Sequence, residues 1–407
     1  MYKKFNLDNG TCIVYEKMPF AKTVSVGIWV RAGSMFETAE ENGISHFIEH
    51  MLFKGTEKRS AARLAEEMDF VGGQMNAYTA RECTCYYTKA LPESLEISLD
   101  LLSDMYYNSL FRTDDIELER GVIIEEINMY EDSPEEVALD SLCEHMWGGS
   151  PLGYQVAGSA EIVSGLTREQ MLSYMHRHYT PANTVISVAG SFDESELIRL
   201  CGKYFGKIGS SEIIPVPQAQ MHGGRWQRKK KIEQAHLSIG YSAFTDGNDE
   251  IYAEGVLNEI FGGSMSGRLF QSVREKRGLC YSIYSYAAKF PTVGMLGVYA
   301  GLKPDSLPEV EKVISEEAEK LCTAEVSSYE LEKTRAQLRC SIIMSQESVN
   351  SVMIGNGKAQ LLRGSIRTDD EIIRRIESVT AQDVRQAARK IFESDKKAVF
   401  VLEPQII

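Results

Sequence analysis

The chain repeats part of its own pattern at a constant distance. Residues 25–30, Ser-Val-Gly-Ile-Trp-Val, match residues 238–243, Ser-Ile-Gly-Tyr-Ser-Ala, and residues 116–120, Ile-Glu-Leu-Glu-Arg, match residues 329–333, Tyr-Glu-Leu-Glu-Lys. Both matches lie 213 positions apart. Because two distant matches with one offset indicate an internal duplication, the 407 residues are predicted to form two similar units rather than one core.

The stretch between the two halves has the composition of a linker. Residues 209–228 contain several Pro and Gly and show no hydrophobic periodicity. We therefore predict a first domain over 1–208, a linker over 209–228 and a second domain over 229–407. Strand patterns alternate with long amphipathic helix patterns in each half, which predicts an α+β fold with a mainly antiparallel sheet packed with helices in each domain.

Composition and charge exclude several classes of protein. Hydrophobic residues make up 43% and charged residues 25%, as in soluble globular proteins, and no apolar run is long enough for a membrane span. The first residues resemble neither a signal peptide nor a transit segment, so we expect a cytoplasmic protein. A net charge of -14 argues against nucleic acid as a partner. The eight cysteines lack CxxC spacing and are predicted to be reduced thiols.

Residues 44–54 predict an amphipathic helix that carries two histidines. His46, Glu49, His50 and Phe53 lie on the stripe opposite the apolar residues at the helical spacing. Two histidines at i and i+4 can hold one metal ion, and Glu49 between them can accept a proton from water. This is the inverse of the HExxH order. The alternative is a surface helix that carries these residues without a metal.

A second predicted helix, over residues 114–132, offers a third ligand. Glu119 and Glu126 lie in one stripe with Val122, Ile123 and Tyr130. Burying two unpaired carboxylates would cost several kcal/mol, so each needs a cation, either a buried Arg or Lys or a metal ion. Catalytic zinc usually has three protein ligands and one open position. Together with the histidine pair, the pattern favours the metal.

These motifs resemble those of the M16 metallopeptidase family, the inverzincins, and in length the processing-peptidase subfamily. The segment from His46 to His50, followed 76 positions later by Glu126, matches the family spacing. The resemblance implies an endopeptidase with one Zn²⁺ per chain, bound by His46, His50 and Glu126. It also implies that Glu49 is the general base and that Glu119 orients the site.

The same resemblance implies residues that bind substrate. Asn76 and Ala77, in a segment from Gly72 that leads into a strand through Tyr86, would pair with an extended peptide by β-augmentation. Phe53 would line the pocket for the side chain after the scissile bond. Glu136 and Asp140 would receive an arginine before the cut. An ordinary turn and a solvated helix face are the alternatives for these two segments.

The second half lacks the metal motif. The stretch that corresponds to His46 through His50 lies near residues 254–258, Glu-Gly-Val-Leu-Asn, and Arg339 matches Glu126. The resemblance implies that Arg274 and Tyr281 grip the substrate backbone. The alternative is a charged helix that ends at Gly278. Because the chain has two domains where some relatives have four, we expect Arg274 and Tyr281 to act in trans across a dimer.

The predicted function is therefore hydrolysis of peptides or unfolded polypeptide segments inside a dimeric chamber, by a homodimer or a heterodimer with a paralogue. The first alternative is a non-catalytic scaffold or peptide-binding subunit of a larger complex, such as occurs in the family. The second is a zinc hydrolase with a non-peptide substrate. The His/His/Glu set suits zinc better than manganese or cobalt.

Overall fold

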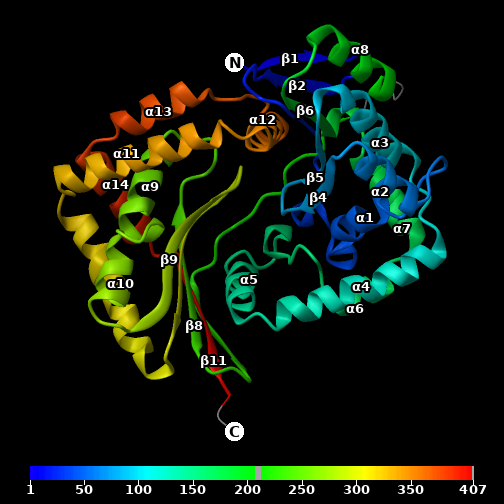
Figure 1. Cartoon of the computed structure of the whole chain (residues 1–407). Coiled ribbons are helices and arrows are strands. Elements are labelled where there is room, and N and C mark those ends of the chain that lie inside the picture. Colours follow the sequence, from blue (N-terminus) through cyan, green and yellow to red (C-terminus); the bar gives the residue numbers. More distant parts are fainter. Residues whose placement is uncertain (207–211, 406–407) are drawn as a thin grey trace. The chain divides into compact units, whose positions relative to one another are not determined.

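The computed structural model describes residues 1–206 and 212–405, which form two compact units. Unit 1 contains Met1–Ile127, Tyr154–Val216 and Ile343–Thr368. Unit 2 contains Asn128–Gly153, Pro217–Ile342 and Asp369–Ile407. Each half of the chain thus contributes one segment to the unit built mainly from the other half (Figure 1).

The predicted domain boundaries at 208 and 229 divide the sequence into its two duplicated halves, and they stay a prediction. Residues 209–211 of the predicted linker lie outside the described residues. A strand, β7, begins at Gly224, inside the range predicted to be a linker.

Each unit is built on one mixed sheet. The sheet of unit 1 has the order β1-β2-β6-β3-β5-β4, and that of unit 2 has the order β7-β11-β8-β10-β9. The strands of unit 1 are β1 (Lys3–Asn6), β2 (Cys12–Lys17), β3 (Val24–Val30), β4 (Gln74–Thr79), β5 (Thr84–Ala90) and β6 (Thr184–Gly190). Those of unit 2 are β7 (Gly224–Lys230), β8 (Ala235–Ala243), β9 (Cys280–Lys289), β10 (Gly294–Leu302) and β11 (Lys397–Pro404).

The two sheets have the same topology. The strands β2-β6-β3-β5-β4 of unit 1 correspond in order to β7-β11-β8-β10-β9 of unit 2. In each series the first pair, β2 with β6 and β7 with β11, is parallel, and the other pairs are antiparallel. The matched segments at 25–30 and 238–243 lie in β3 and β8, the central strands. The fold class is therefore as predicted: two similar α+β units with mainly antiparallel sheets.

Helices cover both sheets. Unit 1 has α1 (Ile44–Leu52), α2 (Ala61–Phe70), α3 (Leu95–Asn108), α6 (Ala160–Gly165), α7 (Arg168–His178), α8 (Glu194–Phe205) and α12 (Val349–Arg363). Unit 2 has α5 (Pro134–Met146), α9 (Ile251–Asn258), α10 (Leu307–Thr323), α13 (Asp369–Ser378) and α14 (Ala381–Phe392). The division between the units falls within α4 (Thr113–Glu131) and α11 (Ser328–Ser345).

The central strand of unit 1, β3, is buried on both faces. Val26 and Ile28 pack into the main core with α1 and α3, whereas Trp29 packs on the opposite face against α12. A Cβ on Gly357 of α12 would lie 2.1 Å from the Trp29 Nε1 atom, so the helix approaches the sheet closely because this residue is glycine. The covering helix comes from the other half of the sequence, which local periodicity does not reveal.

The sheet of unit 2 is covered in a similar way by a helix from the first half. Helix α5 packs on β8 and β11, and the Met146 Sδ atom occupies the space beside Gly240, where a Cβ would lie 2.6 Å away. Gly27 on β3 and Gly240 on β8 are 213 positions apart, and both face the exchanged helix. Both copies therefore have a glycine at the position on the central strand where the exchanged helix packs.

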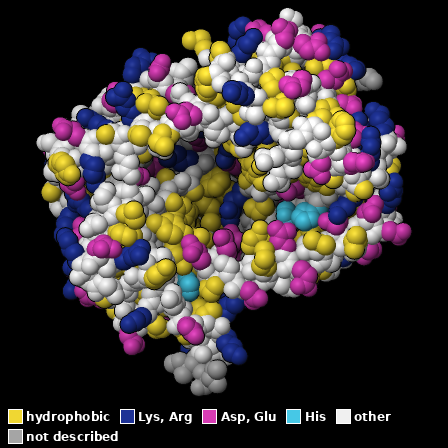
Figure 2. Space-filling view, viewed as in Figure 1, with side chains coloured by type: hydrophobic (Ala, Val, Ile, Leu, Met, Phe, Trp, Pro, Cys, Tyr) yellow, Lys and Arg dark blue, Asp and Glu magenta, His cyan; other side chains and the backbone are white. Residues whose placement is uncertain are grey.

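Some general features bear on the predictions from composition. The eight cysteines form no disulfide among the described residues. Within residues 1–206 and 212–405, no helix is both long and apolar enough to cross a membrane. Acidic and basic side chains are mixed over the visible face of the molecule (Figure 2), so the net charge of -14 does not form a single acidic field there.

Candidate metal centre

Helix α1 begins at a buried carboxylate. Glu37 is 2% exposed and accepts hydrogen bonds from the backbone N–H groups of Gly43 and Ser45, at 2.7 and 2.9 Å. Gly43 precedes the helix with a φ of 93°, a conformation that glycine adopts without strain. Because Glu37 satisfies N–H groups of the first turn, the start of α1, and with it the position of His46, is well defined.

His46, His50 and Glu126 converge as predicted. One ligand atom from each lies within 4.8 Å of the others. The Glu126 Oε2 atom is 3.7 Å from His46 Nε2 and 3.5 Å from His50 Nε2. Glu126 reaches this place from α4, as the periodicity of residues 114–132 predicts. The structure therefore brings together two imidazoles of one helix turn and one carboxylate of a distant helix.

The donor set and its spacing fit zinc. Ligand atoms about 2.0–2.2 Å from a tetrahedral zinc ion lie about 3.4 Å from one another. This is close to the 3.7 and 3.5 Å between the Glu126 oxygen and the two imidazole nitrogens. Burial, and then the neighbouring His50, lower the pKa of His46 to about 4. The imidazole is therefore neutral at neutral pH and keeps the lone pair that a metal requires.

Glu49, the predicted general base, is tied to the edge strand β4. The Thr79 hydroxyl donates a hydrogen bond to Glu49 Oε2 at 2.5 Å. Thr84 donates its own proton to the Ala32 carbonyl at 3.0 Å, which leaves Thr79 to donate toward Glu49. Burial raises the pKa of Glu49. One carboxylate oxygen is thus engaged, and Oε1 is left for chemistry.

Thr79 is not part of any motif that the sequence reveals. It lies two residues beyond Ala77, and because alternate residues of a strand share a face, this spacing was the available signal. The sequence also predicted that the segment from Gly72 leads into a strand through Tyr86. The structure divides it into β4 and β5, joined by a turn at residues 80–83, so Thr79 stands at the end of a strand.

Glu119 lies between His50 and a lysine. It is 4% exposed, and its Oε2 atom is 3.1 Å from His50 Nδ1. Its Oε1 atom is 2.5 Å from the Lys54 Nζ atom. Of the two cations that sequence left open for Glu119, the lysine is present, and the carboxylate also contacts a predicted metal ligand. The sequence motifs did not reveal Lys54, although it follows His50 by four residues, just beyond the end of α1.

The predicted substrate residues of unit 1 border this helix and the edge strand. β4 is the edge of the sheet; Asn76 is exposed and Ala77 is half-buried. The Ala77 N–H group donates to the Asn76 Oδ1 atom at 2.8 Å, so a peptide that pairs with Ala77 would have to displace this side chain. Phe53 follows α1 directly and packs partly against the main core. Its role as a pocket wall stays a prediction.

The other predicted substrate residues belong to unit 2. Glu136 and Asp140 lie on α5, and burial together with the carboxylates of Asp140 and Glu135 raises the pKa of Glu136. Arg274 is in the π-helix η7 (Phe270–Glu275), and its guanidinium lies 5.4 Å from the ring centre of Tyr281, which is 76% exposed. Gly278 has a φ of 62° in the turn between them. The structure brings Arg274 and Tyr281 together.

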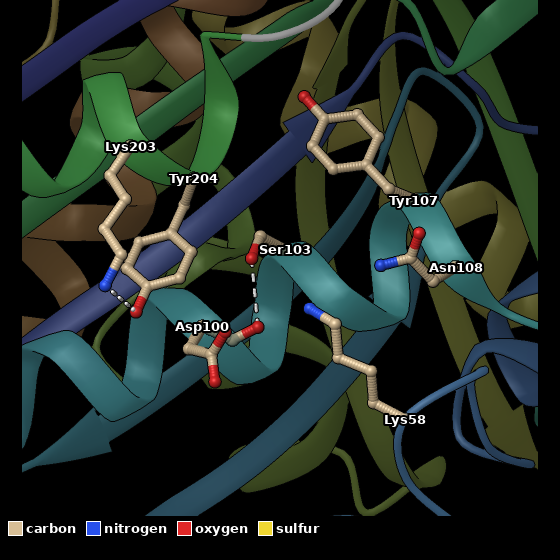
Figure 3. A pocket seen from close by; sticks show the side chains of 7 residues that line it. All are labelled: Lys58, Asp100, Ser103, Tyr107, Asn108, Lys203 and Tyr204. Atoms are coloured by element: carbon tan, nitrogen blue, oxygen red, sulfur yellow. Dashed lines mark hydrogen bonds between the residues drawn. The ribbon is translucent and has the colours of Figure 1, made fainter.

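A separate cavity of about 490 Å³ lies beside α3 and α8 (Figure 3). It is lined by Lys58, Asp100, Ser103, Tyr107, Asn108, Lys203 and Tyr204. Lys203 is held by Glu96, to which its Nζ atom donates at 2.7 Å. The cavity lining includes neither the metal-binding group nor a predicted substrate residue.

Comparisons with known proteins agree with this geometry. The family model described as Insulinase (Peptidase family M16) matches residues 12–160, and the model described as Peptidase M16 inactive domain matches residues 165–338. An uncharacterized zinc protease of Bacillus subtilis, YmxG, is 41% identical over 97% of this chain and 97% of its own length.

Solved structures show the same fold. A protease from Helicobacter pylori superposes with a TM-score of 0.93 at 20% identity and covers 99% of both chains. A chain of Complex III2 from Candida albicans superposes with a TM-score of 0.87 at 20% identity and covers 98% of this chain and 95% of its own. The motif, the convergent His46, His50 and Glu126, and the full-length similarity lead to one conclusion: this chain belongs to the M16 family of peptidases.

Proposed function

We propose that the protein is a zinc-dependent endopeptidase that cleaves peptides or unfolded segments of polypeptides. One observation carries the proposal: His46, His50 and Glu126 present three ligand atoms within 4.8 Å of one another. Three protein ligands that leave a position open are typical of catalytic rather than structural zinc. Similarity to proteins named zinc proteases supports the same function.

In this proposal His46, His50 and Glu126 hold one Zn²⁺ per chain. Zinc, when bound, acidifies a water molecule and polarises the carbonyl of the peptide bond. Glu49 accepts a proton from the attacking water at Oε1, since Thr79 engages Oε2. Glu49 then donates this proton to the nitrogen of the leaving amine as the C–N bond breaks. Thr79 keeps the carboxylate from rotating between these two transfers.

Substrate binding in the proposal uses backbone contacts and charge. An extended peptide pairs with the edge strand β4 at Asn76 and Ala77, which requires little of its sequence. Phe53 lines the pocket for the side chain after the cut. Glu136 and Asp140 attract an arginine before the cut. Burial, and then the neighbouring carboxylates, raise the pKa of Glu136, and a cation would relieve the repulsion between the carboxylates.

The proposal also includes an assembly. Arg274 and Tyr281 grip the substrate backbone across a dimer of the processing-peptidase type, either a homodimer or a heterodimer with a paralogue, which encloses the peptide. The exposed ring of Tyr281 beside the Arg274 guanidinium supports a contact with a partner or a substrate. Cytoplasmic location and the absence of nucleic-acid partners and membrane binding stay predictions from composition.

A quenched fluorescent peptide with one central arginine tests the function. The purified protein should cleave it, 1,10-phenanthroline should stop cleavage, and zinc should restore it. A matched peptide with glutamate in place of the arginine should be cleaved more slowly. A zinc-loaded protein that cleaves neither peptide would contradict the proposal.

The same assay separates the alternative, a non-catalytic scaffold or peptide-binding subunit. The fold occurs in a chain of Complex III2, which at 20% identity indicates a shared fold and nothing more. A scaffold would bind the arginine peptide without cleaving it. The four residues of the motif, His46, Glu49, His50 and Glu126, are all present here, which favours the enzyme.

A further inference from the structure

Lys54 stands at the end of the metal-binding helix. The backbone N–H groups of Phe53 and Lys54 donate to the carbonyls of His50 and Met51 at 3.2 and 3.1 Å, which completes the last turn of α1. Gly55 then adopts a φ of 110° and turns the chain away. Lys54 therefore leaves the helix one turn beyond His50, on a backbone that is hydrogen-bonded up to that point.

The side chain of Lys54 lies beside a buried carboxylate. Its Nζ atom is 2.5 Å from Glu119 Oε1, while the other oxygen, Oε2, is 3.1 Å from His50 Nδ1. An ionised carboxylate only accepts hydrogen bonds, so His50 donates from Nδ1. The other ring nitrogen, Nε2, then carries the lone pair, and it faces Glu126 at 3.5 Å. Lys54, Glu119 and His50 thus form a continuous line that ends at the metal-binding group.

We propose that Lys54 is a positioning residue that fixes the Glu119 carboxylate and thereby orients His50 for metal binding. The ammonium group occupies one oxygen, which prevents the carboxylate from turning away from the imidazole. His50 lies in the last turn of α1, and Lys54 lies in the hydrogen-bonded turn that directly follows this helix. One continuous stretch of backbone therefore places both the imidazole and the cation that holds its carboxylate partner. The inference rests on the proposed function to the extent that His50 is taken as a metal ligand.

A plain ion pair that joins α1 to α4 is the competing interpretation, and the two differ in what they predict for metal binding. Partners of a ligating histidine typically affect metal affinity 10–100-fold when removed. If the ion pair only joins the two helices, its loss would lower the unfolding midpoint and leave the zinc affinity of the folded protein unchanged.

The test measures zinc Kd by competition with a chelating dye, and the visible absorption spectrum of the cobalt-substituted protein. In Lys54→Met, zinc should bind about 10–100-fold more weakly, and the cobalt bands should shift. Lys54→Arg, which keeps a cation beside Glu119, should restore most of the affinity. Lys58→Met is the matched control, since this lysine on the same loop is 63% exposed and lies 3.9 Å from Asp104.

A double-mutant comparison shows whether Lys54 acts through Glu119. In a Glu119→Gln background, Lys54→Met should weaken zinc binding no further. A folded Lys54→Met protein with the zinc Kd and cobalt spectrum of the wild type would overturn the inference.

If Lys54→Met does not fold, Lys54→Gln takes its place, and an unchanged zinc Kd in that variant overturns the inference equally. A wild-type chain that binds no zinc would overturn the proposed function as well. If the wild type binds zinc and the Lys54 variants bind it equally well, the role of Lys54 is refuted and the proposed function is unaffected.

Discussion

Helices α1 and α9 occupy equivalent places in two sheets of the same topology, yet the described metal-binding group includes α1 and not α9. In the corresponding region of the second half, α9 carries Glu254 and Asn258 at the spacing of one helix turn, in place of two histidines. The position of Glu126 corresponds to Arg339, whose Nη1 atom is 3.5 Å from Glu377 Oε1. Both copies of the fold thus place polar side chains on this helix. A metal site also needs a third ligand from another helix, which Glu126 provides in unit 1 and Arg339 does not provide in unit 2.

The two helices differ further in how their carboxylates are satisfied. Thr79 and Lys289 end equivalent edge strands, each opposite the first residue of the next strand. Thr79 donates to Glu49, whereas the Lys289 Nζ atom stays 3.7 Å from Glu254 Oε2. Glu254 is fully buried, and neither of its oxygens has a hydrogen-bond partner among the described residues. Glu254 of unit 2 is thus a buried acid that lacks a hydrogen-bond donor such as the one Thr79 provides to Glu49 in unit 1.

The largest expected effect comes from removing one ligand. His50→Ala should reduce bound zinc from about one ion per chain to none and abolish peptide cleavage, because two remaining protein ligands hold zinc weakly. Asn258→Ala, the matched change on α9, should leave the zinc content and the activity at wild-type levels. Elemental analysis of the two purified variants makes the comparison. Equal zinc loss in both would mean that the two units do not differ as described.

The next effect separates metal binding from catalysis. Glu49→Gln should lower kcat/KM about 10²–10⁴-fold, because the amide cannot take the proton from water. Zinc content should remain that of the wild type, since Glu49 lies outside the convergent group. Kinetics on a quenched peptide and metal analysis on the same sample check both statements. Activity within a few-fold of the wild type would remove Glu49 from the role of base.

Glu254 predicts a pH-dependent stability that belongs to unit 2. Burial raises its pKa from 4.5 to about 7, so the folded state holds the proton more tightly than the unfolded state does. Its contribution is fully present below pH 4.5 and is lost as the pH rises through about 7, a loss of about 3 kcal/mol. Glu254→Gln should lack this loss.

Denaturant unfolding of the wild type and the Gln variant across this pH range provides the measurement. The difference in free energy of unfolding between them should grow with pH and favour the variant above pH 7. A difference that is flat with pH would show that Glu254 is satisfied in a way the structure does not show.

The smallest expected effect concerns the exchanged helix α12. Gly357→Ala should destabilise the protein by about 1–2 kcal/mol, because the added methyl group would meet the indole of Trp29. Gly355→Ala, two residues earlier on the same helix, meets nothing within 4 Å and should stabilise it by up to about 1 kcal/mol. Thermal unfolding of both variants distinguishes close packing from general helix propensity. Equal shifts would argue against the close approach of α12.

Much of this architecture could be predicted from local patterns. The constant offset indicated the duplicated sheets, and helical periodicity placed His46, His50 and Glu126 on faces that meet. The duplication shows in the sequence because both copies keep their matched segments at one offset, and the helix faces show because each depends on spacing within one element. The family spacing between His50 and Glu126 then joined the two helices.

The remainder depends on contacts between distant segments. The second buried face of β3 follows from α12, which lies more than three hundred positions later in the chain. Thr79 contacts Glu49 because β4 ends beside α1. Lys54 contacts Glu119 because α4 places this carboxylate at the end of α1. Periodicity within a single segment does not predict these contacts between distant segments. The motif alone therefore does not reveal Thr79 and Lys54, which orient its residues.

The central claim is that one zinc ion is bound by His46, His50 and Glu126. An anomalous difference map at the zinc absorption edge, from crystals of the zinc-loaded protein, tests it directly. The account predicts one strong peak per chain, about 2.0–2.2 Å from a nitrogen of each imidazole and from a Glu126 oxygen. A peak at other side chains, or a Glu126 carboxylate turned away from the two histidines toward an arginine, would contradict it.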